Sequence, residues 1–512
     1  MKKQYVMGID AGTESIRAVL FDFDGCEIAQ ASCANQTDFP LPGRAEQSPE
    51  QWMTGLITAV KECCARVESF IPEDVVSLCI DGTCSTVVTA YNDGTVIGNA
   101  IMWMDTRATE EVARIACIQH PVLKYCGDED AVEWLVPKAL WLKNHEPSRY
   151  KQADKIVEAL DYLTFRLCGQ WSASVCNATD AWNYVSKEGG FCQSFFDAIG
   201  LSDLPLKFPK RILQMGDCAG VLTAKAATML GLKAGTIVAQ GGIDAHAGML
   251  GMGIVKSGIM GMTIGSSSVH LVLTDGPKFA KGIWGPYPDA ILRGKWLMQG
   301  GQNSTGSVLR WFKDNFAHKT QQQAQQNGKP CYAILDEKAA LVPAGARGLT
   351  ALEYFQGNRS PYRDPLANGV LIGLTLAHQE EDIFRAFLEA AAFGTRAILE
   401  SLYCGGVSID ELRACGGGTK SSLWLQIHAD VCGLPITLME TDNTAALGSA
   451  MCAAIAAKRY PDFTTAVKKM TNKRCTIHPN PTQSLAYDPF YLRYLDLYQA
   501  LKPLWHNLNA TK

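Results

Sequence analysis

One local pattern occurs three times and constrains the fold more than any other feature. In each copy an apolar strand enters a bend of small or hydroxyl residues, and a second strand leaves it towards an Asp-Gly turn. The copies cover residues 7–25, 78–94 and 262–276, with the bends DAGT, DGT and GSSS. Asp-Gly hairpins are common, so two of the three copies are also consistent with chance. Such bends expose N–H groups and hydroxyls to oxygen-rich anions, so a hairpin at the start of each half indicates a duplicated nucleotide-binding architecture.

The spacing of apolar residues predicts an α/β protein with two large domains. Strands are followed by helical patterns over residues 383–402 and 445–458, the second with Asn443 or Thr444 as its N-cap. Because 512 residues exceed what one hydrophobic core normally supports, we expect a domain boundary at residues 250–260. Residues 320–330 contain five glutamines and no apolar period, so we interpret them as a surface loop.

Composition excludes several classes of protein. The 47 Lys plus Arg nearly balance the 51 Asp plus Glu, so the basic excess that nucleic acid binding requires is absent. The sequence has no signal-peptide pattern and no segment long enough to cross a bilayer, so we expect a cytoplasmic protein that does not bind membranes. The 18 cysteines are scattered and never spaced as Cys-x-x-Cys, which favours buried, reduced side chains over a metal site or disulfides.

One acid, Asp244, stands among glycines and small residues in the motif GGIDAHAG, directly after an apolar run. A bend without bulk suggests that a ligand approaches the acid closely, so we interpret Asp244 as a site residue. His246, two residues later, is a possible catalytic base. A lone histidine in an apolar segment is more often a packed, hydrogen-bonded core residue, and we prefer that interpretation.

Two bends suit phosphate groups. In DAGT, Gly12 permits close approach, Thr13 donates a hydroxyl, Arg17 lies four residues beyond and Asp10 can hold Mg²⁺, although the segment is equally consistent with a plain strand–turn–strand corner. The loop CGGGTK at residues 415–420 suits a phosphate or a flat ring, or is a flexible connection to the next helix.

The motif WMDTR at residues 103–107 also has two interpretations. It is either a substrate wall with polar groups or a loop held by an internal ion pair. We expect Asp105 and Arg107 to pair with each other and keep Trp103 as a candidate wall of the site.

Together and in this order, the segments resemble the FGGY carbohydrate kinases. The matching motifs are GIDAGT (8–13), IMWMDTR (101–107), GIDAH (242–246), GNRSP (357–361) and GGG (416–418). The resemblance implies two ribonuclease H-like domains of the actin, Hsp70 and hexokinase type, residues 1–255 and 256–512, with a cleft between them. The D-ribulokinase and pentulose kinase branch looks most similar, on the motifs DGTCST (81–86), PKALW (137–141), WGP (284–286) and GGQ (300–302).

The resemblance also implies an activity, which is ATP-dependent phosphorylation of a sugar hydroxyl, most closely that of a pentulose. It implies that Asp244 is the general base and that Asp10 is linked to Mg²⁺. The residues implied to contact the nucleotide and its phosphates are Asp10, Gly12, Thr13, Arg17, Thr263, Gly265, Gly306, Gly417, Gly418 and Ser421. Those implied to contact the sugar are Thr83, Cys84, Trp103, Glu133, Asp244 and Gln299. A homodimer is expected on the resemblance alone.

Two positions depart from the pattern of the ribulokinases that resemble this chain. Those enzymes carry a substrate-facing lysine two residues before the WNY-like motif and a glutamate before GGQ. Here the two positions fall near Ala181 and at Gln299. Losing a cation and an anion together indicates that a salt-bridged pair has been replaced, which changes the specificity of the pocket.

Two alternatives stay open at this stage. The first is a kinase of a polyol, that is, a pentitol, a tetritol or glycerol, although the arginine–glutamate pair of glycerol kinases is missing at Thr83 and Cys84. The second belongs to another class, an actin- or Hsp70-like ATPase that acts on a protein partner. It shares the phosphate-binding bends but does not need the motifs of the sugar kinases.

Overall fold

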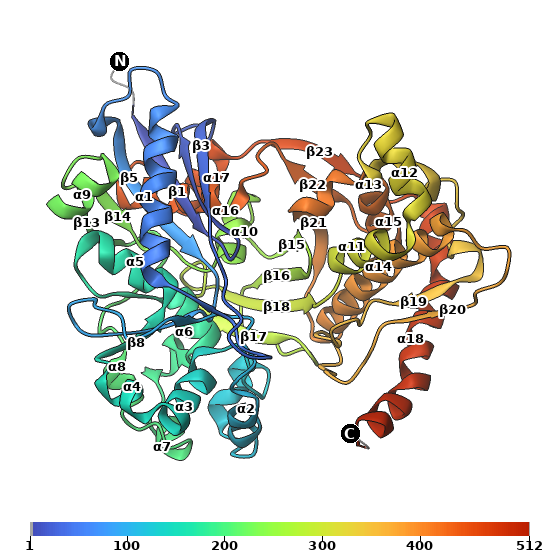
Figure 1. The fold of residues 1–512 in the computed structure, drawn as a ribbon, viewed down its shortest axis with the longest axis horizontal. Helices are drawn as coiled ribbons and strands as arrows, with labels where there is room; N and C mark the ends of the chain where they lie inside the picture. The colour runs from blue at the N-terminus through green and yellow to red at the C-terminus, as the bar shows by residue number, and fades with distance from the viewer. Residues whose placement is uncertain (1–3, 511–512) are drawn as a thin grey trace.

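Two twisted sheets organise the chain into two halves, which lie on the left and right of Figure 1. The computed structural model describes residues 4–510. The first sheet has the order β13 (Cys218–Val221), β14 (Ile237–Ala239), β5 (Val75–Gly82), β1 (Tyr5–Ala11), β2 (Ser15–Phe21), β3 (Glu27–Ala34). The second has the order β17 (Trp284–Pro288), β18 (Trp296–Gln302), β16 (Ser268–Thr274), β15 (Gly258–Ile264), β21 (Ile409–Cys415), β22 (Ile436–Met439), β23 (Lys473–Ile477).

Both sheets repeat one strand arrangement. Strands β1, β2 and β3 pair antiparallel, and β5 and then β14 join in parallel on the other side of β1. Strands β15, β16 and β18 pair antiparallel in the same way, and β21 and then β22 join in parallel beside β15. This duplication is the two-domain, ribonuclease H-like α/β architecture expected from the sequence, so the prediction of the fold class is confirmed.

The three copies of the strand–bend–strand pattern have different outcomes. The first and third form the hairpins β1–β2 and β15–β16, as expected. The middle copy does not, because β6 (Val87–Ala90) leaves the first sheet and pairs with β7 (Ala100–Ile101) and β8 (Lys155–Glu158). Strand β5 already has β1 and β14 on its two edges, so no hydrogen-bonding edge remains for β6.

Helices of both halves cover the first sheet. On one face, α1 (Pro49–Ala65) packs against β2 and β3, and α5 (Ala159–Cys168) packs against β5. On the opposite face lies α16 (Thr444–Ala456), which belongs to the second half of the sequence. A buried cluster joins residues of β1, α1 and α16, so the core of the first sheet needs a helix from the far end of the chain.

The helices of the second half agree only partly with the expectations. The predicted helix at 383–402 is α14 (Glu380–Cys404), which packs against α11 (Gly306–Phe316), α15 (Ser422–Cys432) and α18 (Pro481–Ala510). The predicted helix at 445–458 is α16, and Asn443 precedes it without making a side-chain cap. Of the helices within residues 4–510, none combines the length and the apolar composition needed to cross a bilayer.

The interpretation of residues 320–330 as a loop is wrong. Helix α12 spans His318–Asn327, and Gly328 ends it with a φ of 65°. Lysine, glutamine and alanine favour helix even where no apolar period is visible. The helix is held by one buried residue, Thr320, whose hydroxyl contacts Glu380 of α14 and accepts a hydrogen bond of 2.7 Å from Lys338 Nζ.

The two halves meet where α16 crosses α10 (Asp244–Gly251) at backbone contact. A β carbon on Gly251 would lie 1.9 Å from the carbonyl oxygen of Thr444, and one on Gly448 would lie 1.9 Å from that of Ala247. On the other side of α16, a β carbon on Gly8 of β1 would lie 1.8 Å from the carbonyl oxygen of Ala446. Glycine is therefore required at these three positions by the close approach of the elements.

We expect Gly251→Ala to destabilise the protein by about 1–3 kcal/mol, since the added methyl group forces α10 and α16 apart. Gly248→Ala is the matched control on the same helix, because its β carbon would be 3.7 Å from the nearest atom, an ordinary contact. Urea unfolding of the two variants and the wild type checks this. Equal unfolding midpoints for the two variants would contradict the role given to the crossing.

Candidate active site

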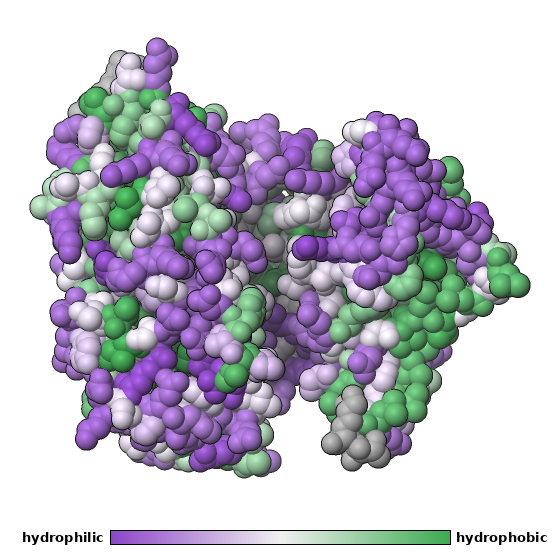
Figure 2. All heavy atoms as spheres, in the orientation of Figure 1, coloured by the Kyte–Doolittle hydropathy of each residue, from purple (hydrophilic) through white to green (hydrophobic). Residues whose placement is uncertain are grey.

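A cavity of about 360 Å³ lies between the two halves, where the surface in Figure 2 is hollowed. It lies at the carboxyl ends of β1, β5 and β14 of the first sheet and of β15 and β21 of the second, the usual place for a ligand in α/β folds. The predicted residues that line it are Asp10, Thr13, Thr83, Cys84, Trp103, Glu133, Asp244, Thr263 and Gln299. All six expected sugar contacts thus share one cavity.

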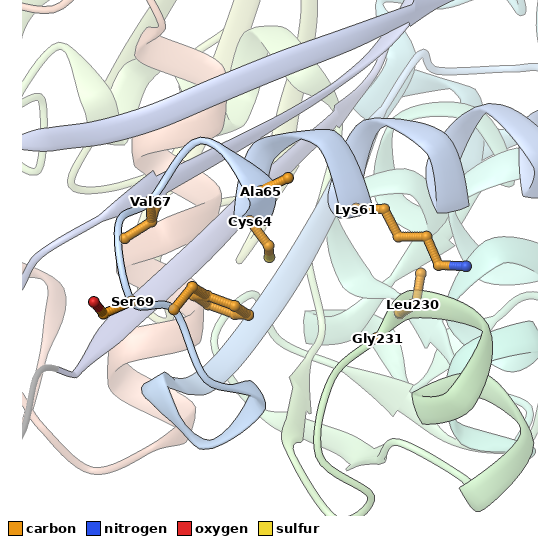
Figure 3. A pocket seen from close by; sticks show the side chains of 8 residues that line it. Lys61, Cys64, Ala65, Val67, Ser69, Leu230 and Gly231 are labelled. Carbon is orange, nitrogen blue, oxygen red and sulfur yellow. The ribbon is translucent and has the colours of Figure 1, made fainter.

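A second hollow of about 420 Å³ lies outside the cleft, between the C-terminal ends of α1 and α9 (Ala224–Leu230) (Figure 3). Lys61 is its single charged lining residue, and the other side chains are mostly small or apolar, such as Cys64 and Leu230. It has none of the carboxylates that gather in the cleft. The cleft cavity is therefore the better candidate for a catalytic site.

Asp244 is the first residue of α10 and is half-buried at the cavity wall. Its Oδ1 accepts a hydrogen bond of 2.6 Å from the backbone N–H of Ala245. Burial, and then the charge of Asp10, raise the pKa of Asp244 to about 7. A carboxyl group with this pKa can take up and release a proton near neutral pH.

Close packing of the protein, rather than the predicted ligand, explains why glycines precede Asp244. A β carbon on Gly241 would lie 1.8 Å from the carbonyl oxygen of Ile80 in β5, and one on Gly242 would lie 2.8 Å from Cys176 Sγ. Protein atoms, rather than a ligand, occupy the space that a side chain would need. The prediction that a ligand explains these glycines is therefore wrong, although the acid that follows them does face the cavity.

Asp10 is close to a second acid that the sequence did not identify as a site residue. It pairs in the parallel register with Asp81 at the end of β5, whose Oδ2 accepts a hydrogen bond of 2.6 Å from Ser449 Oγ of α16. Burial raises the pKa of Asp10, opposed by Arg17, and burial together with Asp10 raises the pKa of Asp81 well above its ordinary value. The sequence contained a signal for Asp81, because the motif DGT begins at the end of β5 as DAGT begins at the end of β1.

Only some of the predicted residues in and after the first bend line the cavity. Thr13 does, and its hydroxyl accepts a hydrogen bond of 2.9 Å from Trp103 Nε1. Trp103 is thus a wall of the cavity and also fixes Thr13. Arg17 instead donates a 2.9 Å hydrogen bond to Asn443 Oδ1 just before α16, and Gly12 lies outside the cavity lining.

The expected nucleotide residues of the second half gather beside the cavity, around the end of β15. The N–H of Gly306 donates to the carbonyl oxygen of Gly265 at 3.0 Å, and a β carbon on Gly418 would lie 2.4 Å from the Ile264 side chain. Ser421 caps α15 by accepting a 3.0 Å hydrogen bond from the N–H of Trp424. A β carbon on Gly417 would meet no atom within 4 Å, so its backbone faces open space.

Buried charges hold the wall of the site. Lys138 of α3 (Leu135–His145) is fully buried, and its Nζ donates to the carbonyl oxygens of Ser85 at 2.9 Å and of Met102 at 2.7 Å. Burial lowers the pKa of Lys138 to about 8. The expected pair of Asp105 and Arg107 is present, with Arg107 Nη2 at 2.7 Å from Asp105 Oδ2. The sequence did not single out Lys138, although a lysine inside an apolar helix was a usable signal.

His246 is buried and hydrogen-bonded, as preferred from the sequence. Its ring nitrogens lie 3.0 Å from Cys176 Sγ and 3.2 Å from Gln299 Oε1, and burial lowers its pKa. The position that faces the cavity near the expected lysine is Asp180 of α6 (Val175–Ala181), whereas Ala181 is fully buried and outside the lining. Other lining residues, to which the sequence analysis assigned no ligand contact, are Ser85, Trp134, Ser267, Arg359, Cys415 and Thr444.

Comparison with known proteins gives one consistent result. The N-terminal domain of the FGGY family of carbohydrate kinases matches residues 5–251, and the C-terminal domain matches residues 260–457. An FGGY carbohydrate kinase domain-containing protein of Xenopus laevis is 33% identical over 96% of both chains. A ribulokinase of Geobacillus thermodenitrificans is 32% identical over 97% of this chain and 94% of its own.

A solved xylulose kinase structure from Rhodospirillum rubrum is similar in fold and in sequence. Its TM-score is 0.85 and its identity 27%, and the match covers 98% of this chain and 100% of that one. The two domain matches and the relatives at about one third identity indicate the same family. The duplicated sheets and the acids in the cleft agree with that family. This chain belongs to the FGGY family of carbohydrate kinases.

Proposed function

We propose that this kinase transfers the terminal phosphoryl group of ATP to a hydroxyl of a pentulose, with Asp244 as the general base. The observation that carries the proposal is the position of Asp244 at the start of α10, in a cavity that both halves line. Two of the similar proteins are named ribulokinase and xylulose kinase, which supports a pentulose as the acceptor. Membership of this family leaves no need for the alternative of an ATPase that acts on a protein.

The proposed chemistry needs little covalent work from the protein. Asp244 accepts the proton of the substrate hydroxyl while the hydroxyl oxygen bonds to the terminal phosphorus and the bond to ADP breaks. Trp103 and Lys138 fix the cavity wall, which holds the acceptor in line and excludes water. The proton leaves Asp244 for solvent after the sugar phosphate departs.

The residues at the two bends suit ATP with Mg²⁺. Within residues 4–510 no three His, Cys, Asp or Glu side chains form a ready-made metal cage. Mg²⁺ at phosphotransfer sites is usually held by one or two carboxylates, water and the phosphates themselves. Asp10 supplies such a carboxylate at the cavity, and Thr13 supplies a hydroxyl beside it. When bound, the cation neutralises charge on the phosphates, and Asp10 and Thr13 orient it.

A polyol, that is, a pentitol, a tetritol or glycerol, is the alternative acceptor. A pentitol differs from a pentulose only in carrying a hydroxyl in place of the carbonyl, and the shorter polyols present the same kind of hydroxyl groups. The test is a coupled assay of ADP release with D-ribulose, D-xylulose, L-ribulose, ribitol, erythritol and glycerol. Highest kcat/KM with a pentulose supports the proposal. Highest kcat/KM with a polyol would replace it by the alternative.

We expect Asp244→Asn to lower kcat for the sugar about 10²- to 10⁴-fold, because the amide cannot take the proton. The dissociation constant for ATP, measured by titration calorimetry, stays near the wild-type value. Asp410→Asn is the control, since Asp410 is exposed at the start of β21, outside the cavity. A variant Asp244→Asn with near wild-type kcat would exclude Asp244 as the base.

The pKa of Asp244 predicts a pH profile. The base must be ionised, so kcat/KM for the sugar falls about tenfold for each pH unit below the pKa of about 7 and is flat above it. The measurement is kcat/KM from pH 5.5 to 9 at saturating ATP and Mg²⁺, with the same profile for Asp244→Asn as a control. A wild-type profile that stays flat down to about pH 5.5 contradicts the prediction.

A side chain at Gly417 tests the nucleotide side. We expect Gly417→Val to raise KM for ATP about 10-fold or more and to leave KM for the sugar unchanged, since the valine enters the space proposed for the nucleotide. Gly276→Val is the matched control, because a β carbon at either glycine meets no atom within 4 Å and Gly276 lies in a turn after β16. If both variants have the same KM for ATP, the nucleotide binds elsewhere.

A further inference from the structure

Asp180, in the cavity wall, has a buried carboxylate oxygen without a hydrogen-bond partner among the described residues. The residue is 3% exposed and lines the cavity. Oδ2 accepts a hydrogen bond of 3.1 Å from Cys84 Sγ, whereas Oδ1 has no partner within residues 4–510. Burying a carboxylate oxygen without a partner is costly, and such an atom is usually satisfied by a bound water, ion or ligand. A substrate hydroxyl can satisfy this oxygen, because Asp180 lines the cavity. The hydroxyl of Tyr287, also without a partner in this range, approaches the same carboxyl group.

Arg359 brings a guanidinium to the same cavity from the second half of the chain. The guanidinium carbon lies 5.0 Å from the centroid of the Trp284 ring, and Cδ would lie 3.1 Å from a β carbon on Gly301. The ring and the close backbone hold the arginine in place. Arg359 attracts Asp180 electrostatically, yet within the described chain the two side chains form no direct ion pair. Both residues line the cavity.

The charges of the cavity disfavour an anionic sugar. Its lining contains the four acids Asp10, Glu133, Asp180 and Asp244, and Arg359 is the single lysine or arginine in that lining. His246 adds no charge near neutral pH, because burial lowers its pKa. A sugar acid or a sugar phosphate bound among these residues would meet more like than unlike charge, which weakens its binding. An uncharged sugar donates hydroxyl hydrogens, which carboxylates accept.

We propose that Asp180 and Arg359 form a subsite that binds adjacent oxygen atoms of the sugar from opposite halves of the chain and restricts the acceptor to uncharged compounds. A substrate hydroxyl donates to Asp180 Oδ1, and the neighbouring hydroxyl or carbonyl oxygen accepts from Arg359. The inference rests on the proposed kinase function and adds the residues that choose the acceptor. Both are specificity residues, because neither takes part in the proton transfer assigned to Asp244.

Titration calorimetry separates sugar binding from catalysis. The probes are D-ribulose, D-xylulose, ribitol and D-gluconate, each titrated into the wild type, Asp180→Asn, Arg359→Met and Asp130→Asn. Asp130 is the matched control, because it is also 3% exposed, has one bonded and one unpartnered oxygen, and lies outside the cavity. Steady-state kinetics of the same proteins give KM and kcat for the sugar and KM for ATP.

For the uncharged compound that binds most tightly, we expect the dissociation constant to rise about 10- to 100-fold in Asp180→Asn and in Arg359→Met. Each substitution has this effect because it removes one charge-assisted hydrogen bond. In both variants KM for the sugar rises together with this dissociation constant, kcat changes less and KM for ATP is unchanged. The control Asp130→Asn behaves as the wild type. D-Gluconate binds the wild type more weakly than every uncharged compound.

Wild-type affinity in Asp180→Asn, an equal loss in Asp130→Asn, or tightest binding of D-gluconate would each overturn the subsite. The failure of the proposed function has a different signature. Sugar binding that weakens in Asp180→Asn and Arg359→Met, without phosphorylation of any compound by the wild type, supports the subsite and contradicts the kinase assignment. If the wild type binds no uncharged compound at all, the subsite is overturned as well.

Discussion

The crossing of α10 and α16 is the constraint on which the rest of the structure depends. Gly251 and Gly448 let the two helices touch through their backbones, and Gly8 lets β1 touch α16 in the same way. Both helices begin at the cavity, α10 with Asp244 and α16 with Thr444. Because a packed interface of backbone atoms has little freedom to adjust, the crossing fixes how the two halves present their residues to the cleft.

The site keeps an electrostatic arrangement that costs stability in the free protein. Burial raises the pKa of Asp10, Asp81 and Asp244, and the charge of Asp10 raises the pKa of Asp81 and Asp244 further. Ser449 of α16 satisfies one oxygen of Asp81, while the other has no partner within residues 4–510. Such perturbed acids gather where a protein binds and transforms ligands, and they agree with the phosphotransfer proposed for the cleft.

The sequence allowed much of the fold to be predicted, and the failures have physical causes. Local sequence patterns predicted the bends after β1 and β15, the helices α14 and α16, and the acids Asp10 and Asp244. The partner of β6 was not, because the number of free edges on β5 depends on strands that arrive much later in the chain. Helix α12 was missed because helix-favouring residues and a buried contact at Thr320 support it in place of an apolar period.

By itself, the sequence determined which residue types occur in which order, and this was enough for the two-domain α/β class, the family and the acid at Asp244. Only the tertiary structure decided which of those residues meet. It directs Arg17 to Asn443 and away from the cavity. It brings Asp180 and Arg359 to one cavity and places Asp81 beside Asp10. The reason is that local patterns encode the state of the backbone, whereas a site is made by side chains far apart in the sequence, whose approach is set by the packing of sheets and helices.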